Sequence, residues 1–166
     1  SSAITFGAES DARAGEWHHF GNDGAGSRYS PLDQINRSNF GDLQLAWRWT
    51  SISQEVTVEY TDVKPSQFKP IPLMVDGLLY VASEISQVAA LDAATGEIVW
   101  QHDPEAWRAG RPANVGFQHR GVAYWADGAD RRIFIATHDS KLVAVNAKTG
   151  EPVATFGEGG VLDLLP

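Results

Sequence analysis

The chain contains an internal repeat with a spacing of about 54 residues. The stretch that begins at Ala90 reads ALDAATGEIVW, and the stretch that begins at Ala144 reads AVNAKTGEPVA, an offset of 144 − 90 = 54 residues. A weaker echo is Trp47, which precedes Trp100 by 53 residues. A fixed period of this length indicates a fold built from repeated supersecondary units, so it constrains the architecture more than any local pattern does.

Each repeat has the composition of four short β-strands. In the first repeat, Asp76-Gly77 separates two apolar β-forming runs, which is the strongest short-range signal for a hairpin. Several runs are apolar at every position, as in strands that are buried on both faces. The helices of about 10 to 15 residues that a parallel α/β sheet needs are missing from the pattern. The predicted strands are 73–75, 78–82, 88–91 and 98–100, followed by 122–125, 133–137, 142–145 and 153–156.

These patterns predict an all-β fold, a partial β-propeller of about two four-stranded antiparallel blades with an N-terminal segment. We assign the whole chain, 1–166, to one propeller domain with blades at about 70–102 and 118–157. Residues 1–44 are expected to be mostly irregular and to lead into a strand at 45–49. Propellers close with about four to eight blades, so this chain needs the remaining blades or a partner chain for closure.

Composition excludes several classes of protein. The 166 residues carry 13 Lys+Arg and 21 Asp+Glu, and a net charge of −8 is a poor electrostatic match to nucleic acid. A content of 43% hydrophobic residues is too high for a disordered chain, and no apolar run is long enough to span a membrane. The absence of cysteine excludes disulfides, thiolate metal sites and covalent c-type haem.

Two stretches that superficially suggest ion sites favour simpler interpretations. The glycine-rich run 21–26 lacks the spaced carboxylates of an EF-hand and the Gly-Lys-Ser/Thr of a P-loop, so we predict a plain turn. His18 and His19 are adjacent, and adjacent side chains point apart in most backbones. We therefore expect no shared metal ion there. The N-terminus shows no signal-peptide pattern, which leaves the compartment open on the residues alone.

The repeat itself carries a family resemblance. The pattern Ala-x-Asp-x-x-Thr-Gly-x-x-x-Trp at 90–100 resembles the tryptophan-docking motif of pyrroloquinoline quinone (PQQ) dehydrogenases, in which it ends the blades of an eight-bladed propeller. Residues 17–47 look like the N-terminal segment of these enzymes, 72–80 like their first full blade, and 117–125 like the segment that enters the cofactor site. The chain is therefore similar to the N-terminal part of the glucose-dehydrogenase-like subgroup. The resemblance implies that the Trp of one motif packs on the Ala and Gly of a neighbouring blade's motif.

The same resemblance implies four cofactor-binding residues. Arg120 matches the family arginine that contacts PQQ, and a guanidinium fork suits both a carboxylate and a developing quinol oxygen. Thr137 matches a position whose hydroxyl bonds a PQQ carboxylate. His119, if a short deletion is assumed, corresponds to a histidine under the PQQ ring. Lys69 stands where the family often has a glutamate that contacts PQQ, and its ammonium group could pair with a PQQ carboxylate.

The activity that the resemblance implies is oxidation of an alcohol or an aldose sugar in the periplasm, with electrons passed to a quinone or a cytochrome. In the family, Ca²⁺ supports this chemistry as a Lewis acid. Its ligands and the catalytic Asp come from later blades, so we assign no catalytic residue and no metal ligand within this chain. The chain alone is expected to be inactive. Without cysteine it cannot carry the paired cysteines of methanol-dehydrogenase-like members.

A second interpretation is a non-catalytic PQQ-like propeller that serves as a binding or scaffold module. Two departures from the family pattern favour it: Lys69 replaces the family Glu, and Ala154 occupies the position at which the second repeat should have Trp. The second blade is accordingly expected to dock less well than the first, or differently.

Overall fold

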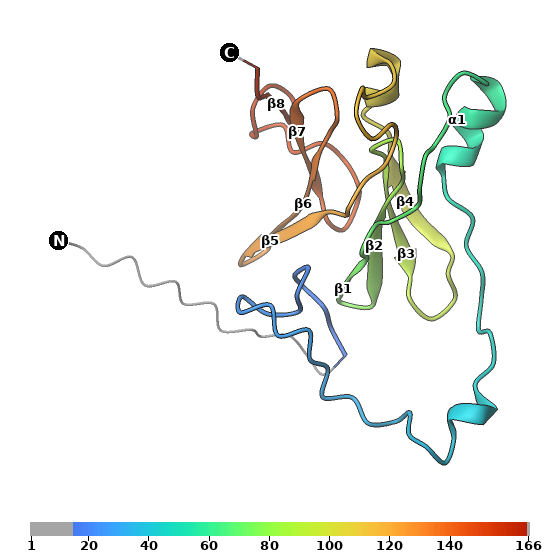
Figure 1. Cartoon of the computed structure of the whole chain (residues 1–166). Coiled ribbons are helices and arrows are strands. Elements are labelled where there is room, and N and C mark those ends of the chain that lie inside the picture. The colour runs from blue at the N-terminus through green and yellow to red at the C-terminus, as the bar shows by residue number, and fades with distance from the viewer. Residues whose placement is uncertain (1–14, 166) are drawn as a thin grey trace.

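The computed structural model describes residues 15–165, which form two four-stranded antiparallel sheets (Figure 1). In each sheet the strands follow the chain order, so every connection is between neighbours. In the first sheet, Asp76 and Gly77 both have positive φ, at 50° and 82°, as the predicted tight turn requires. The first sheet consists of β1 (Leu73–Val75), β2 (Leu78–Ala82), β3 (Val88–Asp92) and β4 (Ile98–His102).

The second sheet departs from the prediction at its last strand. The predicted strand at 153–156 is wrong: Pro152 forms a single bridge with Val145, and residues 153–160 then make an excursion before the chain returns as β8. Pro152 occupies the position of Ile98 in the first repeat and has no N–H to donate to a ladder. The sheet consists of β5 (Ala123–Asp127), β6 (Asp130–Ala136), β7 (Lys141–Asn146) and β8 (Val161–Asp163).

The two sheets pack face to face over one hydrophobic core. Strands β2 and β3 contribute one wall, and β6 and β7 contribute the other. Arg131 of the second sheet also pairs with Asp76 of the first at the rim of this contact. The buried core residues are Leu73, Val75, Tyr80, Ala82, Val88, Ala90, Trp100, Ile133, Ile135, Val143, Val145 and Ala147.

Two tryptophans make the same contact one repeat apart. The Trp100 indole donates a hydrogen bond from Nε1 to the Ala147 carbonyl at 3.0 Å, and a Cβ atom on Gly150 would lie 2.6 Å from its ring. Trp47 donates to the Ala93 carbonyl at 3.1 Å and leaves equally little room at Gly96. Only glycine fits beneath either indole. Each tryptophan therefore seats on the turn that follows the third strand of the next repeat.

The segment before the first sheet is mostly irregular. It contains the 3₁₀ turn η1 (Phe40–Asp42) and one short helix, α1 (Ser53–Glu59). The predicted strand at 45–49 is wrong for the described residues: this stretch has no backbone ladder, because no neighbouring strand within 15–165 lies alongside it, although Trp47 is docked. Figure 1 shows this stretch running apart from the sheets toward α1.

A buried carboxylate ties α1 to the first sheet. Glu84, in the β2–β3 turn, accepts hydrogen bonds from the Ser51 and Ser53 hydroxyls at 3.0 and 2.9 Å. Beside it, side chains from α1, from the 3₁₀ turn η2 (Ala106–Ala109) and from the connector to β5 form a separate cluster. The cluster contains Val56, Tyr60, Val63, Ile85, Trp107 and Phe117.

Within residues 15–165, no helix has the length and hydropathy needed to cross a bilayer.

A glycine substitution tests the indole contact. Gly150→Ala places a methyl group against the Trp100 ring at a backbone φ of 74°, so we expect a loss of about 2–4 kcal/mol in the free energy of unfolding. Gly128→Ala is the matched control, because its φ is also positive at 57° but nothing lies within 4 Å. It should cost only about 1 kcal/mol of backbone strain. Equal shifts of the two variants in denaturant unfolding of the full-length protein would contradict the contact.

Candidate cofactor site

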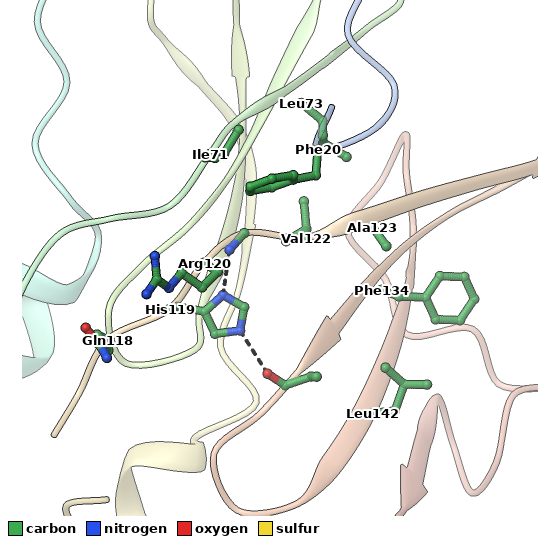
Figure 2. A pocket seen from close by; sticks show the side chains of 12 residues that line it. Phe20, Ile71, Leu73, Gln118, His119, Arg120, Val122, Ala123, Phe134 and Leu142 are labelled. Atoms are coloured by element: carbon green, nitrogen blue, oxygen red, sulfur yellow. Dashed lines mark hydrogen bonds between the residues drawn. The ribbon is translucent and has the colours of Figure 1, made fainter. Parts of the chain in front are cut away.

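A cavity of about 530 Å³ lies where the segments leading into β1 and β5 meet. Its size falls within the range of small-molecule sites. Most of its wall is apolar, and three consecutive polar residues, Gln118, His119 and Arg120, stand along one side (Figure 2). The apolar lining residues include Phe20, Ile71, Leu73, Val122, Phe134 and Leu142.

Two connectors run parallel to each other at this cavity. Residues 65–71 lead into the first sheet and residues 117–121 into the second, with bridges from Pro65 to Phe117 and from Ile71 to Gly121. The Ile71 amide donates to the Arg120 carbonyl at 2.9 Å. Gly121 has a φ of 141°, and a Cβ there would lie 2.8 Å from the Ile71 carbonyl oxygen. The close approach of the connectors therefore requires glycine at this position.

Arg120 and Lys69 place one exposed cation on each connector. Neither forms an ion pair with any residue in 15–165, whereas Arg108, Arg131 and Arg132 all do. Of the two, only Arg120 lines the cavity. An arginine without a carboxylate partner beside an apolar cavity is available for an anionic group of a ligand.

The His119 imidazole uses both of its nitrogens on main-chain atoms. Nε2 lies 2.8 Å from the Ala136 carbonyl oxygen, and Nδ1 lies 3.1 Å from the Gly121 nitrogen (Figure 2). Burial lowers the pKa of His119 and the nearby His138 lowers it further, while the hydrogen bond to Ala136 partly opposes this shift. The ring is therefore held neutral and in one orientation.

The Thr137 hydroxyl is buried in the β6–β7 turn. It donates to an Asp139 carboxylate oxygen and accepts from the Lys141 amide at 3.2 Å. Asp139 pairs in turn with the Lys141 ammonium at 2.8 Å. Burial raises the pKa of Asp139, but the hydrogen bonds from Lys141 and Thr137 outweigh it and leave that pKa below its usual range. Thr137 is only 7% exposed and is not in the cavity wall.

The structure thus brings His119 and Arg120 together and leaves Thr137 and Lys69 outside the lining of the cavity. Phe20 also lines it, which the sequence did not predict: the N-terminal segment reaches the cavity because Trp17 bridges to Met74 on β1. No local sequence signal marks that pairing. Among residues 15–165, no group of three or more His, Asp or Glu side chains is arranged to hold a metal ion.

Comparisons with known proteins place the chain in a family. Residues 17–166 match the PQQ family model described as a glucose/ethanol/alcohol dehydrogenase β-propeller domain. The chain belongs to this family of PQQ dehydrogenase propellers. The two four-stranded sheets are accordingly part of a β-propeller, as the repeat predicts.

Individual relatives span alcohol- and glucose-oxidising members of the family. The chain is 36% identical over 150 residues to the dehydrogenase subunit of the quinone alcohol dehydrogenase of Gluconacetobacter polyoxogenes, covering 86% of this chain and 18% of that protein. It is 33% identical to the quinoprotein glucose dehydrogenase of Gluconobacter oxydans, covering 91% and 20%. The solved quinohemoprotein alcohol dehydrogenase ADHIIG of Pseudomonas putida superposes with a TM-score of 0.72 at 31% identity, covering 92% and 19%. The chain spans about a fifth of the length of these relatives.

Substitutions at Thr137 test whether its hydroxyl stabilises the β6–β7 turn. Thr137→Val keeps the shape but removes the hydroxyl from the Asp139 and Lys141 bonds, so we expect a loss of about 1–3 kcal/mol in the free energy of unfolding. Thr137→Ser keeps the hydroxyl and should lose less, and Thr155→Val, at an exposed position, should change little. Denaturant unfolding of the full-length protein measures all three. A stable Thr137→Val variant would show that the hydroxyl is not needed for the turn.

Proposed function

We propose that this chain is the N-terminal part of a PQQ-dependent dehydrogenase that oxidises an alcohol or an aldose sugar. The observation that carries the proposal is Arg120 at the edge of an apolar cavity, without a carboxylate partner in the described part of the chain and on a segment that the family model covers. Relatives named for alcohol and for glucose support both substrate classes.

The residues present fit the cofactor's chemistry. PQQ carries three carboxylates and an ortho-quinone on a flat ring, and when bound it supplies the oxidation of the substrate's hydroxyl-bearing carbon. Arg120 would bind one of its anionic oxygens through a planar fork of donors. Lys69, exposed on the neighbouring connector, would add a second positive charge near the cavity mouth. Phe20, Ile71 and Val122 would cover the ring and exclude water.

Thr137 and His119 would take smaller parts in this site. Thr137 would reach a carboxylate of the cofactor only by giving up its bond to Asp139. Both nitrogens of His119 are occupied, so its ring could offer a face to the cofactor but no hydrogen bond.

We include the metal ligands, the catalytic base, the electron acceptor and the compartment in the same proposal. We place the Ca²⁺ ligands and the catalytic base on blades outside this chain. The electron acceptor would be a quinone or a cytochrome, the two that appear in the names of relatives, and the compartment would be the periplasm. The indole contacts of Trp47 and Trp100 would be the family's tryptophan-docking contacts, with the remaining blades closing the ring. By itself the chain would be inactive.

The experiment uses the full-length protein loaded with PQQ and Ca²⁺. The protein should reduce an artificial dye only when a substrate from a panel of primary alcohols and aldoses is added. Arg120→Ala should weaken PQQ binding, followed by quenching of tryptophan fluorescence, by about 10- to 100-fold, because a charge-assisted hydrogen bond is lost. Arg120→Lys should restore part of the affinity, since it keeps the charge without the fork.

The matched control is Arg132→Ala, which removes an arginine that already pairs with Asp130. It should leave PQQ affinity unchanged. If the wild-type protein binds no PQQ and reduces no dye across the panel, the dehydrogenase proposal fails. The non-catalytic propeller is then the better interpretation.

A further inference from the structure

The hydrogen bonds of His119 determine its tautomer. A carbonyl oxygen only accepts and a backbone amide only donates, so Nε2 must carry the proton toward Ala136 and Nδ1 must be the bare nitrogen toward Gly121. The imidazole is therefore neutral, and neither nitrogen is left to bond a ligand. Figure 2 shows the ring spanning from its own connector to the end of the neighbouring strand.

This arrangement fixes the backbone on both sides of Arg120. The imidazole attaches the 117–121 connector to the end of β6 and at the same time bonds the amide of Gly121, the residue after Arg120. The carbonyl of Arg120 itself accepts from the Ile71 amide of the neighbouring connector. The Arg120 side chain is exposed and forms no ion pair within residues 15–165, so this backbone anchoring determines where the side chain starts at the edge of the cavity.

We propose that neutral His119 is a positioning residue, which clamps the backbone around Arg120 and so holds the guanidinium at the cofactor cavity. This proposal rests on the proposed function of the cavity as a PQQ site. His119 then acts on the cofactor through Arg120 and makes no hydrogen bond to the cofactor itself.

The clamp predicts a dependence on pH. A proton on Nδ1 would face the N–H of Gly121, so two donors would oppose each other and the bond would be lost. The charged and ionisable groups around this ring come from each element at the cavity. They are Lys69 and Arg120 on the connectors, Arg28 stacked on Phe20 of the N-terminal segment, and His138, Asp139 and Lys141 in the β6–β7 turn, where Asp139 is paired to Lys141. The pKa of His119 is lowered in the folded protein, chiefly by burial. The clamp is therefore present at neutral pH and is lost as pH falls through that lowered pKa.

The test is a double-mutant cycle for PQQ affinity in the full-length protein. His119→Phe keeps an aromatic ring and removes both hydrogen bonds, and we expect about tenfold weaker binding at neutral pH. In an Arg120→Ala background the same change should cost less than about twofold, because the residue that it positions is absent. His119→Asn, which can restore one bond, should fall between His119→Phe and the wild type. His19→Phe, at an exposed histidine, is the control and should change nothing.

The PQQ affinity of the same variants is also measured as a function of pH. Wild-type affinity should decline as the pH is lowered from 7 to 5, and His119→Phe should lack the part of this decline that the clamp causes. If His119→Phe costs the same with and without Arg120, or costs nothing, the positioning role is wrong. An unchanged pH profile in His119→Phe would also contradict it.

Hydrogen exchange separates this proposal from the proposed function. Amide exchange of the peptide covering 117–123 should be faster in His119→Phe than in the wild type, whether or not PQQ binds. If the wild type binds no PQQ but exchange accelerates, the proposed function fails and the backbone clamp holds. If exchange is unchanged, the clamp is overturned independently of any cofactor.

Discussion

The contact between the Trp100 indole and Gly150 determines how the two sheets meet. The indole is 8% exposed, and removing about 200 Å² of aromatic surface from water stabilises by about 5 kcal/mol. The Ala147 carbonyl accepts hydrogen bonds from both Trp100 Nε1 and the Tyr80 hydroxyl, each at 3.0 Å. Burial raises the pKa of Tyr80 to about 12, which keeps this hydroxyl a donor across the physiological range. Two donors on one carbonyl leave little freedom in the angle between the sheets.

The position of the candidate site depends on that packing. When the faces of the sheets are held together, the connectors that enter β1 and β5 lie side by side and exchange backbone hydrogen bonds. The cavity opens between them, and Arg120 stands at its edge because Gly121 allows the connectors to approach closely. The cavity between the two sheets thus follows from how the sheets dock. It needs no helix and no dedicated binding loop.

Local chemistry and periodicity were sufficient to predict much of this structure. Asp76-Gly77 specified a hairpin turn, and the apolar run 78–82 is half-buried or buried at every position. The apolar run 133–136 differs from the prediction, because Ile133 and Ile135 are buried on one face while Ala136 is exposed on the other. The fourth strand of the second sheet was missed because strand propensity at 153–156 competes with a proline that cannot extend the ladder, and the outcome depends on the excursion 153–160. The segment 45–49 has strand composition, yet a strand also needs a neighbour, and none lies alongside it among the described residues.

At the site, the motif around Arg120 was visible in the sequence, but the role of its neighbours was not. The bond from His119 to Ala136 joins residues 17 positions apart and depends on where β6 ends. Phe20 reaches the cavity through a pairing of Trp17 with Met74 that no pattern announces. Thr137 shows the converse: its residue type matches a cofactor contact, while its hydroxyl is engaged in the turn.

The proposed cofactor site depends on Arg120 as the anchor of an anionic group of PQQ at this cavity. A crystal structure of the full-length protein grown with PQQ measures this directly. We expect a cofactor oxygen within hydrogen-bond distance of the Arg120 guanidinium, with His119 still bonded to Ala136 and Gly121. PQQ bound elsewhere, with Arg120 remote from every cofactor oxygen, would contradict it.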